Sequence, residues 1–394
     1  MSFFALRMKS CLILVLLLMA STATSAADDG GSLLLTISSG TMPIESLAFS
    51  PDGLQIVAPY DTTGARVYST ETGDMIHHLT HTTDVKAVAF SKDGKLIATV
   101  DTTFHTKFWD AETGMQVQTF LGTYLPMKIV FSPAGNHLAM VTPTGVQIYD
   151  INTGTQIYTA GALAHDAAYL VDKSVPAVTS TRLLVTSTTG IDMYDADSTY
   201  TMIQNFAPLT GADTEARALA VHPDGTHVAA AFSGASGASF TIKVYEVAAV
   251  PMLVKTLHGH TMTVGSLAFS PFGGQLVSTT GYMEAKVWEF PSGLLVRSLD
   301  NTMDHKTVDF SASGLIATSD MTGNVHLYSA FTGCRPQGPG RMVRFKCSKQ
   351  NFIDNFGCVE DSCGNLQCPP ELKEADARAL CSNHQVQYEQ QQGN

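Results

Sequence analysis

The sequence has no cysteine between residues 12 and 333, although the chain contains seven Cys among its 394 residues. No disulfide can therefore form within this long segment, and its stability has to come from apolar packing and backbone hydrogen bonds. Basic residues are scarce in the same segment, where residues 27–333 hold 14 Lys and Arg against 28 Asp and Glu, a net charge of −14. An acidic body without a basic stripe repels phosphate backbones, so we do not expect nucleic acid as a partner.

Apolar runs of membrane-spanning length are also missing. The run Leu12–Ala20 follows Arg7 and Lys9 and is followed by small residues that end at Ala26. This order is typical of a cleaved secretory signal, and the run is too short to cross a bilayer comfortably. We expect residues 1–26 to be a signal peptide. The protein would then be secreted, or reach another exported and oxidising compartment, with no stable membrane insertion after cleavage; a retained membrane anchor is the alternative.

Cysteines are instead concentrated at the other end of the chain, in residues 334–394. An even number of Cys in a short exported segment predicts a disulfide-bonded unit, although zinc is the competing interpretation. The spacing favours disulfides, because thiolate zinc sites usually contain a pair of Cys separated by two residues. We expect a separate Cys-rich tail with a short helix within residues 369–381. The disulfide candidates are Cys334, Cys347, Cys358, Cys363, Cys368 and Cys381.

Motifs that carry catalysis are absent as well. The sequence contains no GxSxG elbow, no phosphate-binding glycine loop, no HExxH pair and no Cys nucleophile with an evident base. The cluster HHLTH suggests a metal at first sight, but neighbouring His77 and His78 should point to opposite faces of a strand. The sequence therefore predicts neither an enzyme, nor a cofactor, nor a metal site.

What the sequence does contain is a repeat. The motif LAFSPDG at Leu47–Gly53 returns in near-copies whose phenylalanines Phe49, Phe90 and Phe131 are 41 residues apart. Apolar residues alternate with polar ones between these markers, and Gly, Pro and Asp interrupt them. Such alternation predicts short antiparallel strands, and a period near 40 indicates a propeller blade.

A second marker, an aromatic residue near the end of each unit, occurs seven times. Only six copies of the first marker are obvious, but DAAYLV at Asp166–Val171 fits the missing strand of a divergent fourth unit. Seven units of four strands are therefore expected. The second markers are Tyr68, Trp109, Tyr149, Tyr194, Tyr245, Trp288 and Tyr328.

These markers resemble those of the WD-repeat family of β-propellers, most closely in Leu257–Phe290 and His81–Asp110. The resemblance covers about residues 31–333 and implies an all-β, seven-bladed β-propeller. The last unit stops after three strands, whereas Gly31–Gly40 reads as a strand that precedes the first unit. We expect this N-terminal strand to complete the last blade and close the ring, which leaves no open sheet edge.

The family resemblance also implies a hydrogen-bonded tetrad of His, Ser or Thr, Asp and Trp in a blade. The sequence supplies most of it twice, as His81, Thr99 and Trp109 and as His260, Ser278 and Trp288. We expect these residues to be structural, because a buried indole and imidazole need partners. The resemblance places the Asp six residues before the aromatic, where Thr103 and Tyr282 stand, so the sequence predicts no complete tetrad.

The family is known mainly as binding platforms, which implies a partner protein bound at a rim of loops. The connections between second and third strands, and between the fourth strand and the next blade, share one face in that family. They carry large apolar residues here, which suit a protein-binding hot spot. The predicted rim residues are Tyr60, Phe104, Tyr124, Met262, Tyr282, Met283, Met303 and Met321.

The function expected from these patterns is a secreted, non-enzymatic protein-binding scaffold. Two alternatives remain. One is an exported propeller hydrolase that holds a metal ion in the central channel; the other is a Cys-rich tail that is itself the binding module, carried by an inert ring.

Overall fold

A computed structural model describes most of the chain between Leu33 and Ala330, which forms one compact unit. The second unit comprises residues 1–32 and 331–394. The predicted signal peptide, the six cysteines of the tail and the predicted helix at 369–381 lie outside the described residues. The described ranges are 33–161, 163–175, 178–209, 213–234, 240–248, 250–299 and 303–330, with four two-residue strands in the second unit.

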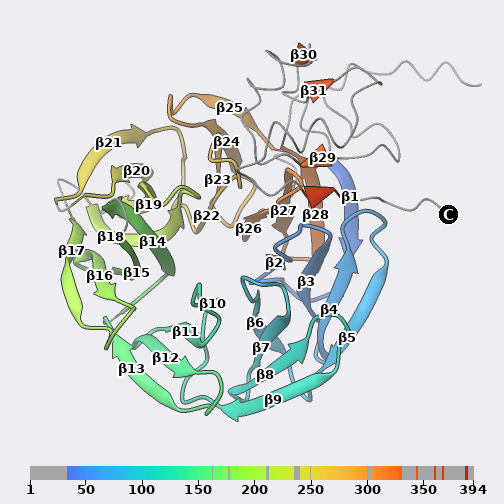
Figure 1. Ribbon diagram of the computed structural model, residues 1–394. Coiled ribbons are helices and arrows are strands. Elements are labelled where there is room, and N and C mark those ends of the chain that lie inside the picture. The colour runs from blue at the N-terminus through green and yellow to red at the C-terminus, as the bar shows by residue number, and fades with distance from the viewer. Residues whose placement is uncertain are drawn as a thin grey trace, which may run out of the picture. The chain divides into compact units, whose positions relative to one another are not determined.

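The unit Leu33–Ala330 is a ring of seven antiparallel sheets, each with four strands. Figure 1 shows the sheets arranged as blades around a common centre. This confirms the predicted all-β, seven-bladed propeller. Alternating apolar residues explain the strands, because each strand has to pack against a neighbouring blade.

The first three blades follow the chain as simple meanders, with the innermost strand first. Blade 1 consists of β2 (Ala48–Phe49), β3 (Gln55–Tyr60), β4 (Gly64–Ser69) and β5 (Met75–Thr80). Blade 2 consists of β6 (Val85–Phe90), β7 (Leu96–Asp101), β8 (His105–Asp110) and β9 (Gln116–Leu121). Blade 3 consists of β10 (Lys128–Phe131), β11 (His137–Thr142), β12 (Gly145–Asp150) and β13 (Gln156–Ala160).

The next three blades repeat this order, and the divergent fourth unit forms a full sheet whose first strand includes most of the predicted Asp166–Val171 segment. Blade 4 consists of β14 (Ala167–Val175), β15 (Val178–Ser187), β16 (Gly190–Asp195) and β17 (Met202–Pro208). Blade 5 consists of β18 (Asp213–Val221), β19 (His227–Gly234), β20 (Phe240–Glu246) and β21 (Met252–Leu257). Blade 6 consists of β22 (Ser266–Phe269), β23 (Gln275–Thr279), β24 (Ala285–Glu289) and β25 (Leu295–Ser298).

Blade 7 is built from both ends of the ring. It contains β26 (Val308–Phe310), β27 (Leu315–Ser319), β28 (Asn324–Ser329) and, as its outermost strand, β1 (Leu33–Ser38). Ile37 pairs with Val325, and Thr36 pairs with His326 in the antiparallel ladder between β1 and β28. The predicted closure by the N-terminal strand is therefore confirmed.

The apolar core is divided among the blade interfaces. The buried apolar residues form seven clusters, and each cluster joins two neighbouring blades. Between blades 7 and 1, for example, Ile37 and Val325 pack with Ile56 and Tyr68. Burial at these interfaces is the main stabilising contribution in a ring without cysteine, at roughly 25 cal/mol for each Å² of apolar surface removed from water.

Polar side chains join the blades near the central channel, where the innermost strands have no further strand to pair with. Asp309 on β26 accepts hydrogen bonds from the backbone N–H groups of Phe49 and Phe310, at 2.9 and 2.8 Å. In blade 4, Asp166 accepts from the N–H of Leu219 in blade 5 at 2.9 Å and from the Lys128 ammonium of blade 3 at 2.6 Å. These carboxylates satisfy donors that would otherwise stay unpaired at a strand edge.

The recurring SPDG motif closes the turn between the first and second strands of a blade. In blade 1 the Ser50 hydroxyl donates to the Asp52 carboxylate at 2.5 Å and accepts from the backbone N–H of Gln55 at 2.9 Å. Gly53 has φ of +77°, a left-handed conformation that glycine adopts without steric cost. The motif returns along the chain because most blades need this turn.

In the second unit the structure describes two short ladders. β29 (Val343–Arg344) pairs with β32 (Gln387–Tyr388), and β30 (Val359–Glu360) pairs with β31 (Leu366–Gln367). Among the described residues of the whole chain, no helix has the length and apolar character needed to cross a bilayer.

Candidate functional site

Two sets of connections meet at one end of the propeller, and we call this end the rim. It comprises the connections between the second and third strands of each blade and those from the fourth strand to the next blade. Backbone hydrogen bonds join the two sets, from the Gly122 N–H to the Phe104 carbonyl at 2.8 Å and from the His305 N–H to the Tyr282 carbonyl at 3.0 Å. In blades 2 and 6 these hydrogen bonds hold the two connections against each other.

A tetrad of side chains anchors the rim in blade 2. The Trp109 indole N–H donates to the Thr99 hydroxyl at 2.8 Å, and that hydroxyl lies 2.7 Å from His81 Nε2. His81 Nδ1 lies 2.9 Å from the Asp101 carboxylate, which can only accept while it is ionised. The four groups thus form one chain of hydrogen bonds, buried beneath the connection that carries Phe104.

Blade 6 contains the same arrangement with a glutamate as the acid. The Trp288 indole donates to Ser278 at 2.8 Å, and Ser278 lies 2.7 Å from His260 Nε2. His260 Nδ1 lies 3.1 Å from the carboxylate of Glu284, which also accepts from the backbone N–H of Thr261 at 3.1 Å. Glu284 therefore ties two rim connections together.

The expectation of an incomplete tetrad was wrong in both of these blades. The acid is not at the expected position of Thr103 or Tyr282. It comes from Asp101, two residues earlier, and from Glu284, two residues later. A carboxylate can reach the same imidazole from several backbone positions in a short connection, so a fixed spacing does not identify it.

The electrostatics of both tetrads favour a neutral imidazole. Burial lowers the pKa of His81 and of His260, and the neighbouring carboxylates offset this effect only in part. Burial also acts to raise the pKa of Glu284, but hydrogen bonds from Thr261, Lys286 and His260 outweigh it and lower that pKa to about 2. The glutamate is therefore ionised and the imidazoles are neutral at physiological pH.

Six of the predicted rim residues are exposed on these connections. Their exposed fractions run from 37% for Phe104 to 58% for Tyr282. Large apolar side chains with this much exposure are available to a partner. The six are Phe104, Tyr124, Met262, Tyr282, Met283 and Met321.

The other two predicted rim residues, Tyr60 and Met303, are only partly exposed. Tyr60 is the last residue of β3, and the guanidinium carbon of Arg66 lies 3.1 Å from the centre of its ring. The His78 imidazole packs against the same ring at 5.8 Å between centroids. Tyr60 is thus engaged within blade 1, which limits what it can offer to a partner.

Three further exposed apolar residues on the rim were not predicted. Met42, Met127 and Leu163 are 43%, 44% and 55% exposed. Each lies on a connection that leads into the innermost strand of a blade, where Met262 and Met303 also lie. Their place between the fourth strand of one unit and the first strand of the next could have identified them from the sequence.

Phe104 has a strained backbone. Its φ is +68°, which is uncommon for a bulky residue, and the conformation is held by a hydrogen bond from its N–H to the Asp101 carbonyl at 3.0 Å. Strain of this kind costs about 1–3 kcal/mol and tends to occur at functional positions. The exposed ring of Phe104 is therefore held where an ordinary backbone would not place it.

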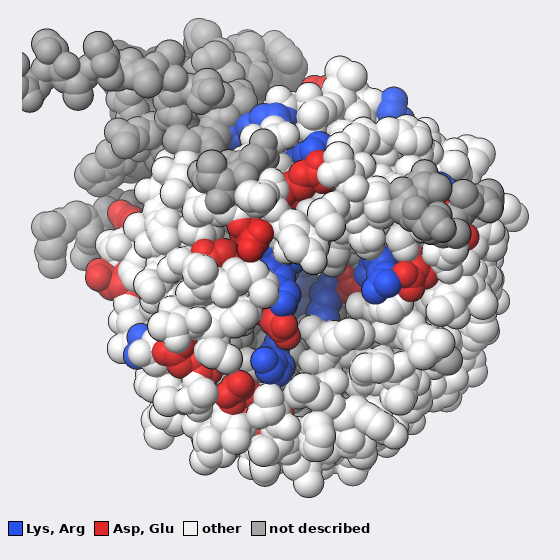
Figure 2. All heavy atoms as spheres, turned by 180° about the vertical axis from the view of Figure 1, so that it is seen from behind, with Lys and Arg blue, Asp and Glu red and all other residues white. Residues whose placement is uncertain are grey.

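Charged side chains of both signs lie on and beside the innermost strands. Lys306 pairs with Glu45 at 2.8 Å, and Glu215 pairs with His165 at 3.1 Å and with Arg217. Figure 2 shows basic and acidic residues mixed around a central hollow. Mixed charge beside the exposed apolar residues would orient a polar partner rather than exclude one.

The histidines of HHLTH do not converge. His77 Nε2 lies 3.1 Å from the Glu112 carbonyl, His78 packs on Tyr60, and His81 belongs to the blade 2 tetrad. The structure therefore gives these three side chains separate neighbours.

Known proteins give two findings. Residues 73–110 and 251–289 match the family model described as WD domain, G-beta repeat, and these segments end at the two tryptophan strands. Among solved structures, the fold is similar to the β-propeller domain of Cps50 (Swd1) from Myceliophteria thermophila. The TM-score is 0.64 at 16% identity, with 75% of this chain and 99% of that chain covered.

At this identity the structural similarity shows the fold alone. Among curated proteins, no sequence matches this chain. The blade count, the ring closure and the two matched repeats agree with the propeller fold that this similarity shows. The chain is a seven-bladed β-propeller that contains WD40 repeats.

Proposed function

We propose that this protein is an exported, non-enzymatic scaffold that binds a partner protein on its rim. WD40 propellers generally mediate interactions between proteins and are typically non-catalytic. The observation that carries the proposal is the set of exposed apolar residues on rim connections of several blades, together with paired charges on and beside the innermost strands. Exposed apolar residues with a polar neighbourhood have the composition of a protein interface.

The best anchors are the exposed aromatic residues Phe104, Tyr124 and Tyr282. Aromatic side chains dominate binding energy at interfaces, where each fully desolvated anchor contributes on the order of 2 kcal/mol. The methionines beside them are flexible and fit irregular surfaces. The rim therefore offers rigid anchors set among adaptable contacts.

Photocrosslinking tests the binding site directly. The photoreactive amino acid benzoylphenylalanine would replace Tyr282 on the rim or, as a control, Ile157, which is 45% exposed on the outer strand β13. We expect benzoylphenylalanine at position 282 to crosslink to one protein in extracellular fluid. The triple variant Phe104→Ala, Tyr124→Ala, Tyr282→Ala should no longer capture that protein. Equal crosslinking from Ile157, or undiminished capture by the triple variant, would argue against the rim.

Export can be tested separately. The proposal rests on the basic, apolar and small-residue order of residues 1–26 and on the six cysteines of the tail. Protein recovered from the medium of its source cells should begin after Ala26 and should show no free thiols in residues 334–394. Retention of Met1 in an intracellular protein with reduced cysteines would contradict this part of the proposal.

A further inference from the structure

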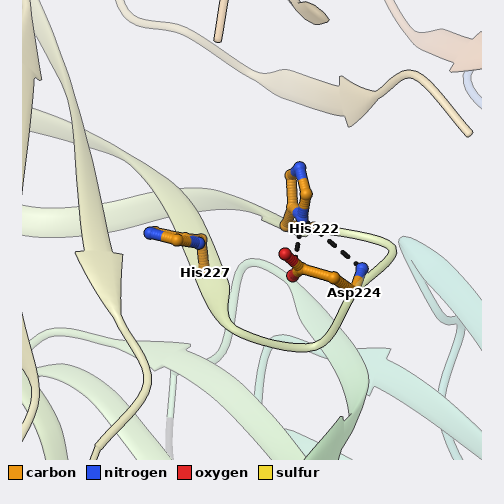
Figure 3. A group of neighbouring side chains, drawn as sticks. All are labelled: His222, Asp224 and His227. Carbon is orange, nitrogen blue, oxygen red and sulfur yellow. Dashed lines mark hydrogen bonds and ion pairs between the residues drawn. The ribbon is translucent and has the colours of Figure 1, made fainter. Parts of the chain in front are cut away.

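Three side chains with metal-ligating atoms come together at the turn between β18 and β19, in blade 5. His222, Asp224 and His227 each offer a nitrogen or oxygen atom, and these atoms all lie within 4.8 Å of one another. Figure 3 shows the three side chains around the turn, with the Asp224 carboxylate next to the His222 ring. His222 is buried, His227 is half-buried and Asp224 is exposed, so the group is open to solvent on one side.

The turn is a variant of the one that recurs in the other blades. The His222 N–H donates to the His227 carbonyl at 2.9 Å, as the Ser50 N–H does to the Gln55 carbonyl at 2.9 Å in blade 1. Serine stands at the equivalent position in most other blades, at Ser50, Ser91, Ser132, Ser270 and Ser311. Blade 5 therefore keeps the backbone of the turn but replaces a hydroxyl with an imidazole.

This replacement changes the chemistry of the contact with the aspartate. In blades 1 and 2 a serine hydroxyl donates to Asp52 at 2.5 Å and to Asp93 at 2.7 Å. In blade 5, His222 Nε2 lies 3.1 Å from the carbonyl oxygen of Gly273. A carbonyl can only accept, so Nε2 carries the proton of the neutral ring.

The other ring nitrogen of His222 then has a lone pair that faces a carboxylate. His222 Nδ1 lies 2.6 Å from Asp224 Oδ1 and accepts a hydrogen bond from the Asp224 backbone N–H at 3.4 Å. Histidine ligands of metals usually donate their remaining N–H to a carbonyl or carboxylate, as His222 does to Gly273.

Aromatic packing holds both imidazoles in place. The Phe290 ring lies 4.9 Å from the His222 ring and 5.2 Å from the His227 ring, between centroids. Phe269 packs edge to face against His222 at 5.1 Å. Ligands fixed by their surroundings lose little conformational entropy when an ion binds.

We propose that His222, Asp224 and His227 form a binding site for a divalent transition-metal ion, with zinc as the first candidate. Two imidazole nitrogens and one carboxylate oxygen are ligands that suit zinc, and copper and nickel also favour imidazole. Ligand atoms on a tetrahedral zinc are roughly 3.3 Å apart. His222 Nδ1 and Asp224 Oδ1 lie closer than this, at 2.6 Å, and all three ligand atoms lie within 4.8 Å of one another, so the exposed Asp224 side chain has to turn when an ion binds. Water or a further donor completes the coordination.

The site lies on a connection between first and second strands, at the end of the propeller opposite the rim. It is thus independent of the proposed protein-binding surface. The ion would link the two ends of the β18–β19 hairpin turn, since His222 precedes the turn and His227 begins β19.

Zinc titration of the metal-free, full-length chain tests the proposal. Free thiols would be alkylated first, so that the tail cysteines cannot contribute ligands. The test variant is His222→Ser, because serine is the residue that closes this turn in other blades and should leave the fold intact. The matched control is His258→Ser, which removes an exposed histidine from the β21–β22 connection.

We expect the wild-type chain and His258→Ser to bind one more equivalent of Zn²⁺ than His222→Ser, or to bind it at least tenfold more tightly. Asp224→Asn, which keeps an oxygen acceptor for the turn, should weaken binding in the same direction. Cobalt bound in place of zinc should give visible absorption bands of nitrogen and oxygen ligation that His222→Ser lacks. Zinc uptake that is absent from the wild type, or equal in the wild type and His222→Ser, would overturn the proposal.

Discussion

The hydroxyl of Thr99 accepts a hydrogen bond from the Trp109 indole at 2.8 Å and lies 2.7 Å from the imidazole of His81. Thr99 and its two partners are all buried. One hydroxyl therefore satisfies two polar groups that cannot reach water. It also connects strand β7 to strand β8 and to the connection after β5, beneath the rim of blade 2.

Replacement of Thr99 by valine should destabilise the propeller. The substitution keeps the shape of the side chain but leaves a buried indole N–H and a buried imidazole nitrogen without a partner, at a cost of about 2 kcal/mol in the free energy of unfolding. Urea denaturation measures this difference. Thr99→Ser keeps the hydroxyl and serves as the control; equal stability of the two variants would show that the hydrogen bonds contribute nothing.

Stability should fall as the pH drops from about 7.5 to about 5.5. The pKa values of His81 and His260 are lowered from 6.5 in the folded protein, mainly by burial, so the unfolded chain binds more protons in this range. The stabilisation is complete above the unfolded pKa and is lost as the pH falls towards the folded one. Denaturation midpoints at the two pH values measure the effect, which should be smaller in the double variant His81→Gln, His260→Gln. Greater stability at the lower pH would contradict this reasoning.

Ring closure makes the N-terminal strand a test of the architecture. Ile37 on β1 is 3% exposed and packs in the cluster between blades 7 and 1, whereas Leu33 on the same strand is 40% exposed. We expect Ile37→Ala to lower the free energy of unfolding by about 3 kcal/mol, because it removes buried contacts and leaves a cavity. Leu33→Ala should change it by less than about 0.5 kcal/mol. Similar effects of the two substitutions, measured by thermal or urea denaturation, would mean that β1 does not complete blade 7.

The left-handed backbone of Phe104 predicts an unusual order of stability. Both Phe104→Gly and Phe104→Ala remove the ring, but only glycine adopts a φ of +68° without strain, so the glycine variant should be more stable by about 1 kcal/mol. Tyr124 is also exposed on the rim and is not among the positive-φ residues of the described chain. At Tyr124 the alanine variant should be at least as stable as the glycine variant. An alanine variant that is also at least as stable as the glycine variant at position 104 would exclude strain at Phe104.

Much of the fold was predictable because its information is local and repeated. Phe49, Phe90 and Phe131 recur at 41 residues, and alternation within each unit shows which residues face a neighbouring blade. The three-strand seventh unit and the spare strand at residues 31–40 together required closure, since an open edge is costly. The site was less predictable. The sequence identified the connections that form the rim, but it could not show that the Tyr60 ring lies under Arg66 whereas Tyr282 is exposed.

The sequence by itself determined the number of blades, the strand that closes the ring and the loops that form the rim, because each depends on periodicity along the chain. Only the tertiary structure decided which acid completes each tetrad and that His222, Asp224 and His227 converge. These contacts depend on how far a side chain reaches from its own backbone position and on which ring packs beside it. Carboxylates at different offsets, such as Asp101 and Glu284, can therefore reach equivalent imidazoles, and no fixed spacing in the sequence records that outcome.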